Sequence, residues 1–324
     1  MIEPEHTASL EPSASTAETL TTLEASGYSL VRPTPERFWQ GWAELTNDAF
    51  DERFDRLDEV RGKDIVLGFL GRSHIGDVLC MSRLVRLLTT HYSCRVHVVR
   101  HRSTYKVLEN HPHLAGYSND HRVHLSECAR GPGHMIQKLE RYFGLPLDPF
   151  PRPEIHLSSE ESHWAWQMRS MLPRNRPVAL VCRGSITDNG IARADTLEWQ
   201  NWVNILSNRF TVVHVALTDI ARLEEAVRLR DSARAAWRPD QILDNCFVFE
   251  NLTTRQFFAI FSVVDLYFGP NTGGAHLAAA FDVPAVVVLN SRQYRSMPAF
   301  PDRIEGNRWH HESFLYPYHS FLLG

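Results

Sequence analysis

The sequence predicts an α/β protein whose two parallel-sheet halves face each other across a cleft. Two series of short apolar strands alternate with helical segments, and a stretch with four prolines, 146–158, separates them. The chain has 324 residues, enough for about two domains of roughly 150 residues each. We therefore expect an N-terminal extension over 1–60, a first half over 61–155 and a second half over 156–324.

The N-terminal extension differs in composition from the rest of the chain. Residues 1–60 contain thirteen acidic residues and four arginines, whereas the whole chain has a formal net charge of -4. The remaining residues therefore carry a small positive balance. Residues 1–30 are rich in Ser, Thr, Ala and Glu, which suggests a loose leader. Aromatic and leucine residues at helical intervals over 35–59 predict one or two amphipathic helices, so we expect the extension to be partly helical.

The first half begins with a strand–loop–helix–strand unit. An apolar run over 64–70 predicts a buried strand, and a glycine-containing loop precedes an amphipathic helix over 77–92. A second strand is expected over 95–100, and this βαβ order favours a parallel sheet. Asp77 then lies at the start of the helix, at the carboxyl edge of the sheet. It is either an ordinary helix cap, which the spacing alone favours, or a general base facing the cleft.

The second half repeats the alternation. Strands are expected over 178–182, 211–216, 246–249, 265–269 and 285–289. Helices are expected over 159–172, 197–207, 219–237, 253–264 and 275–281. The tail over 303–324 is aromatic and histidine-rich, and it has no clean period.

Two loops of the second half offer groups that could bind an anion. Asn271, Thr272, Gly273 and Gly274 form a turn before a helix that contains His276, and exposed N–H groups at a helix start can hold phosphate. The turn can equally be a plain connection, and His276 a packed histidine. Arg183 follows the first strand of this half and could pair with a diphosphate, although a surface arginine has the same pattern. The chain has three lysines, so a phosphate clamp has to use arginine, histidine or backbone N–H groups.

Several classes of protein are excluded by composition. The positive balance is far below that of a nucleic-acid-binding domain, and the apolar runs are too short to span a membrane. The first twenty residues lack the positive charge of a signal peptide. Five cysteines without a CxxC pair indicate neither a disulfide framework nor a zinc site, so we expect a cytoplasmic protein. The 17 histidines show no ligand spacing, and no metal site or cofactor is expected.

Two motifs together resemble the bacterial heptosyltransferases of glycosyltransferase family 9. The first is Ile75-Gly76-Asp77-Val78-Leu79, followed by a helix and a strand. The second runs from Val264 through Asn271-Thr272-Gly273-Gly274-Ala275-His276 to Ala280, and Val283-Pro284-Ala285-Val286 follows it. The resemblance covers about residues 64–300. It implies a GT-B fold with two Rossmann-like domains, in which the first half binds mainly the acceptor and the second the nucleotide-sugar.

The resemblance also implies a role for each matching residue. Asp77 would be the general base of an inverting, metal-independent transfer, and Gly76, His74 and Arg72 would lie on the acceptor side. Residues on the donor side would be Asn271, Thr272, Gly273, Gly274, His276, Glu250, Arg183, Ser185 and Arg193. Two of the departures from the family pattern concern the donor side. Asn271 stands where the family commonly has Asp, and no lysine follows the first strand of the second half, so Arg183 or Arg193 would replace it.

The function implied is transfer of a sugar from a nucleotide-sugar, with ADP-heptose as the first choice, to an acceptor hydroxyl. The acceptor would be a lipopolysaccharide core, or a soluble natural-product or protein acceptor, because no basic amphipathic helix for docking on lipid is found. Two alternatives share the fold: a nucleotide-sugar 2-epimerase and a non-catalytic nucleotide-sugar-binding protein. The sequence leaves the oligomeric state open.

Overall fold

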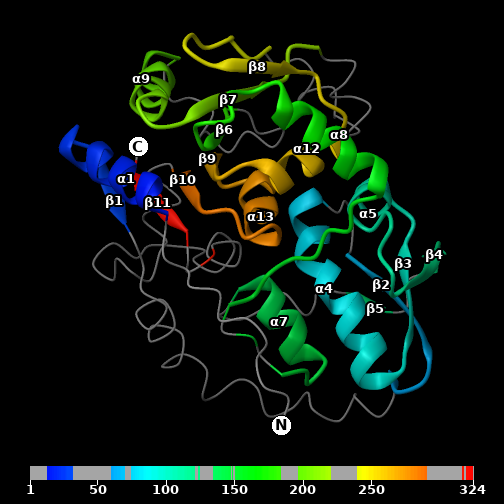
Figure 1. The fold of residues 1–324 in the computed structure, drawn as a ribbon. Helices are drawn as coiled ribbons and strands as arrows, with labels where there is room; N and C mark the ends of the chain where they lie inside the picture. Colours follow the sequence, from blue (N-terminus) through cyan, green and yellow to red (C-terminus); the bar gives the residue numbers. More distant parts are fainter. Residues whose placement is uncertain are drawn as a thin grey trace.

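The computed structural model contains two β-sheets, one parallel and one mainly parallel, with helices packed against them (Figure 1). It describes residues 13–31, 60–69, 74–120, 123–124, 134–146, 148, 150–183, 196–219, 239–289, 316 and 319–323. The helices predicted over 35–59 lie outside these residues, as does most of the helix predicted over 219–237. Among the described helices, none combines the length and the apolar character needed to cross a bilayer.

The smaller sheet belongs to the first half of the chain. It has four strands in the order β4-β3-β2-β5, and all pairs are parallel. The strands are β2 (Asp64–Gly68), β3 (Arg95–Val99), β4 (Leu114–Ser118) and β5 (Val123–His124). The helices of this half are α4 (Ile75–Tyr92), α5 (Arg102–Val107) and α7 (Met135–Tyr142). The βαβ unit from β2 through α4 to β3 is the one that the sequence predicts.

The larger sheet belongs mainly to the second half. Its order is β1-β11-β10-β9-β6-β7-β8, and every pair is parallel except the edge pair β1–β11. The strands are β1 (Ser29–Val31), β6 (Val178–Cys182), β7 (Thr211–Ala216), β8 (Phe247–Glu250), β9 (Leu266–Pro270), β10 (Ala285–Leu289) and β11 (Ser320–Leu323). The helices are α1 (Ala14–Ala25), α8 (Ser159–Ser170), α9 (Thr196–Ser207), α12 (Thr254–Ile260), the 3₁₀ turn η3 (Phe261–Val263) and α13 (Gly273–Ala280).

The N-terminal segment is part of this larger sheet. Helix α1 packs against α9, where Leu20 and Leu23 are buried in the same cluster as Trp199 and Trp202. Strand β1 pairs with β11, so that Ser29 faces Leu323. The prediction of a loose leader over 1–30 is therefore wrong for residues 14–30. Burial of two leucines and pairing of the strand outweigh the polar composition that suggested it.

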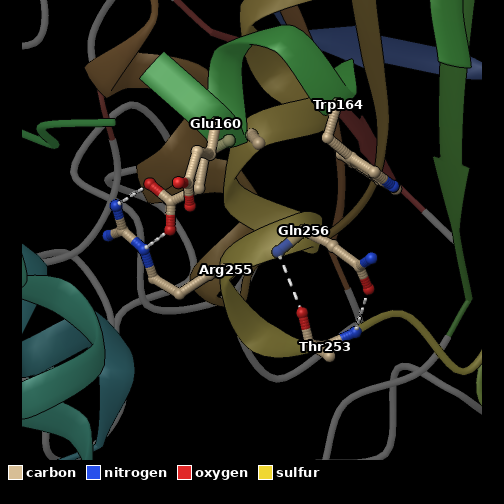
Figure 2. A pocket seen from close by; sticks show the side chains of 7 residues that line it. Glu160, Trp164, Thr253, Arg255 and Gln256 are labelled. Atoms are coloured by element: carbon tan, nitrogen blue, oxygen red, sulfur yellow. Dashed lines mark hydrogen bonds and ion pairs between the residues drawn. The ribbon is translucent and has the colours of Figure 1, made fainter. Parts of the chain in front are cut away.

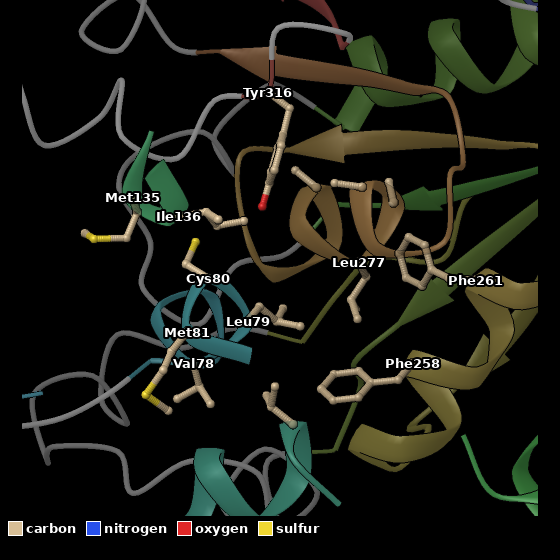
Figure 3. Close-up of a cluster of buried hydrophobic side chains, with 14 of the residues drawn as sticks. Val78, Leu79, Cys80, Met81, Met135, Ile136, Phe258, Phe261, Leu277 and Tyr316 are labelled. Atoms are coloured by element: carbon tan, nitrogen blue, oxygen red, sulfur yellow. The ribbon is translucent and has the colours of Figure 1, made fainter. Parts of the chain in front are cut away.

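A continuous apolar core joins the two halves. Buried side chains of α4, α7, α12 and α13 belong to one cluster (Figure 3). Arg255 of α12 adds a buried polar connection, since its guanidinium donates to the carbonyl oxygens of Lys106 at 3.0 Å and His156 at 2.7 Å. The same group pairs with Glu161 on α8 at 2.6 and 2.5 Å. These contacts tie α12 to α5, to α8 and to the segment that precedes α8.

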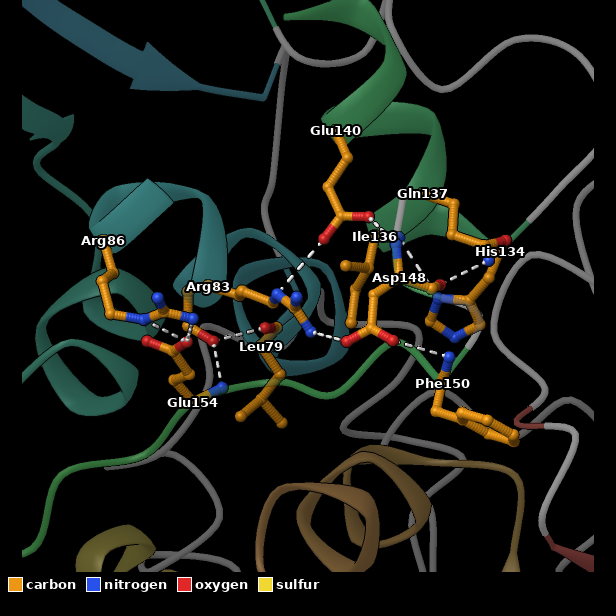
Figure 4. Close-up of polar contacts among 11 residues, drawn as sticks. Leu79, Arg83, Arg86, His134, Ile136, Gln137, Glu140, Asp148, Phe150 and Glu154 are labelled. Atoms are coloured by element: carbon orange, nitrogen blue, oxygen red, sulfur yellow. Dashed lines mark hydrogen bonds and ion pairs between the residues drawn. The ribbon is translucent and has the colours of Figure 1, made fainter. Parts of the chain in front are cut away.

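Charged groups tie α4 to α7 and to the segment that follows it (Figure 4). Arg83 of α4 lies 3.2 Å from the carboxylate of Glu140 and 2.5 Å from that of Asp148. Burial raises the pKa of Glu140 to about 7, although the nearby Arg83 acts in the opposite direction. Gln137 donates to the carbonyl of Asp148 at 2.8 Å. The proline-rich segment is thereby anchored to the first half.

Candidate functional site

The start of α4 places Asp77 at the carboxyl edge of the smaller sheet. His74 is the N-cap residue in extended conformation, and Asp77 occupies the third helical position. Oδ2 of Asp77 accepts the main-chain N–H of His74 at 2.9 Å. A carboxylate there also interacts favourably with the helix dipole. The half-buried carboxylate of Asp77 thus caps the helix, which is one of the two interpretations that the sequence allows. This hydrogen bond fixes the orientation of the carboxylate.

The start of α13 is the second part of the site. Thr272 is its N-cap residue, and the helix begins at Gly273, two residues before the predicted start. Oγ1 of Thr272 accepts the N–H of Gly274 at 3.4 Å, which is a long contact. Oδ1 of Asn271 is buried without a hydrogen-bond partner among the described residues. The helix start therefore presents donors and one unpaired acceptor at the carboxyl end of β9.

Tyr267 explains one of the two glycines of this turn. Its fully buried ring lies beneath the turn, and its hydroxyl donates to the carbonyl of Pro270 at 3.2 Å. A Cβ atom on Gly274 would lie 2.7 Å from Cζ of Tyr267, closer than such atoms approach. A Cβ on Gly273 would meet its nearest neighbour, Cγ2 of Ile75, at an ordinary 3.5 Å. Gly274 is thus required for packing, whereas Gly273 is not.

These adjacent glycines make a matched pair of variants. Gly274→Ala should lower the free energy of unfolding by about 1–3 kcal/mol, because the new methyl group overpacks against Tyr267. Gly273→Ala should change it by less than about 0.5 kcal/mol. Urea denaturation of both variants measures the difference. Equal stability of the two variants would contradict the packing role of Gly274.

The two helix starts meet across the boundary between the halves. A Cβ on Gly76 would lie 3.1 Å from the ring of His276, so the main chain of α4 approaches α13 closely. Sγ of Cys80 is 3.8 Å from Nδ1 of His276. Ile75 lies against Gly273. The structure thus brings Asp77 and the glycine turn, which are about 195 residues apart in sequence, to the same place.

His276 is a packed residue inside this contact. Its side chain is buried, and Nδ1 is 2.6 Å from the hydroxyl of Tyr316. Burial lowers the pKa of His276 to about 3, so its imidazole is neutral at neutral pH. The rings of His134 and His319 also contact Tyr316, with centroids 4.4 and 5.1 Å away. The sequence did not indicate Cys80, Tyr267 or Tyr316, because their role depends on contacts between distant elements.

Arg183 and Glu250 have partners elsewhere on the same edge of the larger sheet. Arg183 is buried, and its guanidinium donates to the carbonyl of Gln241 at 2.9 Å and to Oγ1 of Thr196 at 3.1 Å. Glu250 accepts the hydroxyl of Thr218 at 2.9 Å. It ends β8, which is separated from β9 by β6 and β7. Arg72, Ser185 and Arg193 lie outside the described residues.

A hollow of about 240 Å³ lies between α8 and α12 (Figure 2). Its lining includes Glu160, Trp164, Arg255 and Gln256. The charge of Arg255 is already matched by Glu161, so the hollow presents no unpaired cation for a diphosphate. It shares no residue with the predicted donor or acceptor side.

Comparison with solved structures shows the fold. A family 9 glycosyl transferase from Veillonella parvula DSM 2008 aligns with a TM-score of 0.52 and 12% identity over 81% of this chain and 86% of that chain. TibC, a dodecameric iron-containing heptosyltransferase from enterotoxigenic E. coli solved with ADP-D-beta-D-heptose, aligns with a TM-score of 0.50 and 14% identity. That alignment covers 80% of this chain and 62% of TibC. No family model and no curated protein matches the sequence. The chain has the fold of the family 9 glycosyltransferases.

Proposed function

We propose that the chain is an inverting glycosyltransferase of the heptosyltransferase type. It would move a sugar from a nucleotide-sugar, with ADP-heptose as the first candidate, to an acceptor hydroxyl without a metal ion in the reaction. The observation that carries the proposal is the meeting of two helix starts, one with Asp77 and one with the Thr272–Gly274 turn. The shared fold and the ADP-heptose bound to TibC support the choice of donor.

In this proposal the second half binds the donor. The N–H groups at the start of α13 would receive the diphosphate, and the unpaired Oδ1 of Asn271 would accept a hydrogen bond from the donor. Arg183 would act indirectly, because its guanidinium already holds residues 196 and 241 at the edge of the site. The first half, with Gly76 and His74 beside Asp77, would bind the acceptor.

The transfer itself would be a single displacement. Asp77 accepts the proton of the acceptor hydroxyl while the oxygen of that hydroxyl forms a bond to the anomeric carbon of the donor sugar. The bond from that carbon to the diphosphate breaks on the opposite face, which inverts the configuration. Negative charge grows on the leaving diphosphate, and the fixed dipoles at the start of α13 stabilise it. The acceptor would be a lipopolysaccharide core or a soluble alcohol, in the cytoplasm.

Thermal unfolding in the presence of nucleotides tests the donor half. We expect ADP and ADP-heptose to stabilise the chain by about 2.7 kcal/mol over the ligand-free protein at a hundred times the dissociation constant. UDP and GDP should stabilise it less at the same concentration. Gly273→Ala should weaken this effect without changing the stability of the free protein. The proposal would be contradicted if ADP, UDP and GDP stabilised the chain equally, or if none of them stabilised it.

Incubation of the protein with the donor alone distinguishes a transferase from an epimerase, because an epimerase would change the sugar without an acceptor.

A further inference from the structure

Three potential metal ligands meet beside the segment that joins the two halves. His111 precedes β4, and Glu154 and His156 lie in the segment before α8. One ligand atom from each side chain lies within 4.8 Å of the other two. Nε2 of His111 is 3.8 Å from Oε2 of Glu154, and the rings of His111 and His156 meet edge to face with centroids 4.6 Å apart.

The atoms that face this point are buried and unsatisfied. Nε2 of His111, Oε2 of Glu154 and Nε2 of His156 are shielded from solvent and have no hydrogen-bond partner among the described residues. A buried polar atom without a partner costs about 1–3 kcal/mol. Such atoms are rare in folded proteins, so three from neighbouring side chains require an explanation. A cation bound by all three would satisfy them together.

Other contacts already hold the three residues in place. Oε1 of Glu154 accepts from Nε and Nη2 of Arg86 at 2.8 and 2.7 Å (Figure 4). Oε2 is the carboxylate oxygen that lies 3.8 Å from Nε2 of His111. Oγ of Ser82 accepts the N–H of Glu154 at 2.7 Å. Arg255 donates to the carbonyl of His156. Groups that orient ligands in this way are a regular part of metal sites.

We propose that His111, Glu154 and His156 bind one divalent transition-metal ion of the zinc type. Two imidazoles and one carboxylate suit zinc, whereas calcium and magnesium prefer oxygen ligands. Ligand atoms at about 2.1 Å from a tetrahedral zinc stand about 3.4 Å apart. The 3.8 Å separation between His111 and Glu154 therefore has to shorten by a few tenths of an ångström. The separations to His156, which are at most 4.8 Å, have to shorten by up to about 1.4 Å.

The role of the ion would be structural. It would fasten the segment over 151–158 to the smaller sheet, next to the point where Arg255 fastens it to the second half. The site is apart from Asp77, because Arg86 is nine residues further along α4, or about 13 Å. The inference is therefore independent of the proposed transfer. It also differs from the sequence-based expectation that the chain has no metal site.

One contact opposes the metal. The main-chain N–H of His113 lies 3.3 Å from Nδ1 of His111, which favours the tautomer with its proton on Nε2. A metal at Nε2 requires that proton on Nδ1, so the contact has to open and lowers the affinity. The arrangement that competes with the metal is the direct approach of Nε2 of His111 to Oε2 of Glu154 at 3.8 Å.

Equilibrium dialysis of the full chain, without a histidine tag and after treatment with a chelator, tests the site with Zn²⁺. We expect one ion per chain at micromolar free zinc, and affinity lowered about tenfold or more in His111→Asn and His156→Asn. His156→Asn keeps the Arg86–Glu154 pair intact, so loss of binding there reflects the ligand itself. His113→Asn, which alters a neighbouring histidine outside the cluster, is the matched control and should bind like the wild type.

Circular dichroism of each variant shows whether it is folded, and Co²⁺ reports the ligands. Bound cobalt should give the intense visible bands of a four-coordinate site in the wild type, and His111→Asn should lose them. Failure of the folded wild type to bind one ion at micromolar zinc would overturn the proposal. Equal binding by the wild type and both histidine variants would also overturn it, because other histidines would then hold the zinc.

Discussion

Replacing Asp77 by Asn is expected to slow sugar transfer by a factor of about 10²–10⁴, the usual contribution of a general base. The amide oxygen can still accept the N–H of His74, so the cap at the start of α4 persists. Stability should fall by about 1 kcal/mol or less, through loss of the charge at the helix start. Donor affinity should be nearly unchanged, because the donor groups belong to the second half. Initial rates with ADP-heptose and an acceptor, together with nucleotide binding, measure these effects.

Asp265→Asn is the matched control for this variant. Asp265 is also a carboxylate that accepts a main-chain N–H, that of Val178 at 2.7 Å, but it precedes β9 at the end opposite the glycine turn. Its substitution should cost some stability and leave turnover of the folded protein unchanged. If Asp77→Asn turns over at the wild-type rate, Asp77 is a helix cap and the general base lies elsewhere.

Lowering the pH from 7 to 5 is expected to remove about 4 kcal/mol of unfolding free energy through His276 and His319. Burial lowers the pKa of each to about 3, whereas both rings titrate near 6.5 in the unfolded chain. Between pH 6.5 and 3, the two histidines therefore bind protons in the unfolded state but stay neutral in the folded state. The stability that depends on these neutral rings is complete above pH 6.5 and is lost as the pH falls toward 3.

Other groups also modify this pH dependence, among them His134, His214 and Glu140. Burial also lowers the pKa of His134 and His214, which adds to the loss in acid. The raised pKa of Glu140, about 7, has the opposite effect, since the folded state then binds the extra proton between pH 4.5 and 7. Protonation of Glu140 therefore adds about 2 kcal/mol to the free energy of unfolding when the pH is lowered from 7 to 5. The histidines are therefore expected to dominate.

Urea denaturation at pH 7 and pH 5 measures the difference. His319→Gln should reduce the loss between the two pH values by about 2 kcal/mol, because one titrating ring is removed. His163→Gln, at an exposed histidine on α8, should leave it unchanged. A wild-type protein equally stable at both pH values would show that these rings are accessible to protons in the folded state.

Local pattern predicted most of the sheet elements. Strands over 178–182, 211–216 and 285–289 are found with the expected bounds, because each is a short apolar run between turn residues. Strand β4 was missed, since the LAGYS segment is only half-buried and carries no apolar alternation. Strand β11 was missed because it is buried by pairing with β1 and β10. The residue pattern of the tail does not reveal these partners.

The candidate site was predictable where function follows from a local motif. The start of α4 and the turn before α13 are visible as a glycine and a polar residue between a strand and a helix. The buried ring of Tyr267 beneath that turn, and Tyr316 against His276, are tertiary contacts without a sequence signature. The same holds for His111 and Glu154, which are 43 residues apart and become neighbours only when the segment before α8 packs against α4.

The pairing of β1 with β11 has a consequence for the order in which the chain folds during synthesis. Ser29 pairs with Leu323, so α1 and β1 emerge from the ribosome long before their partner strand exists. Contacts across such a sequence distance form slowly, and the apolar side chains of α1 stay without their edge strand until residues 320–323 have been made. The smaller sheet, built from residues 64–124, can pair its strands well before that moment. We therefore expect completion of the larger sheet to be a late step of folding.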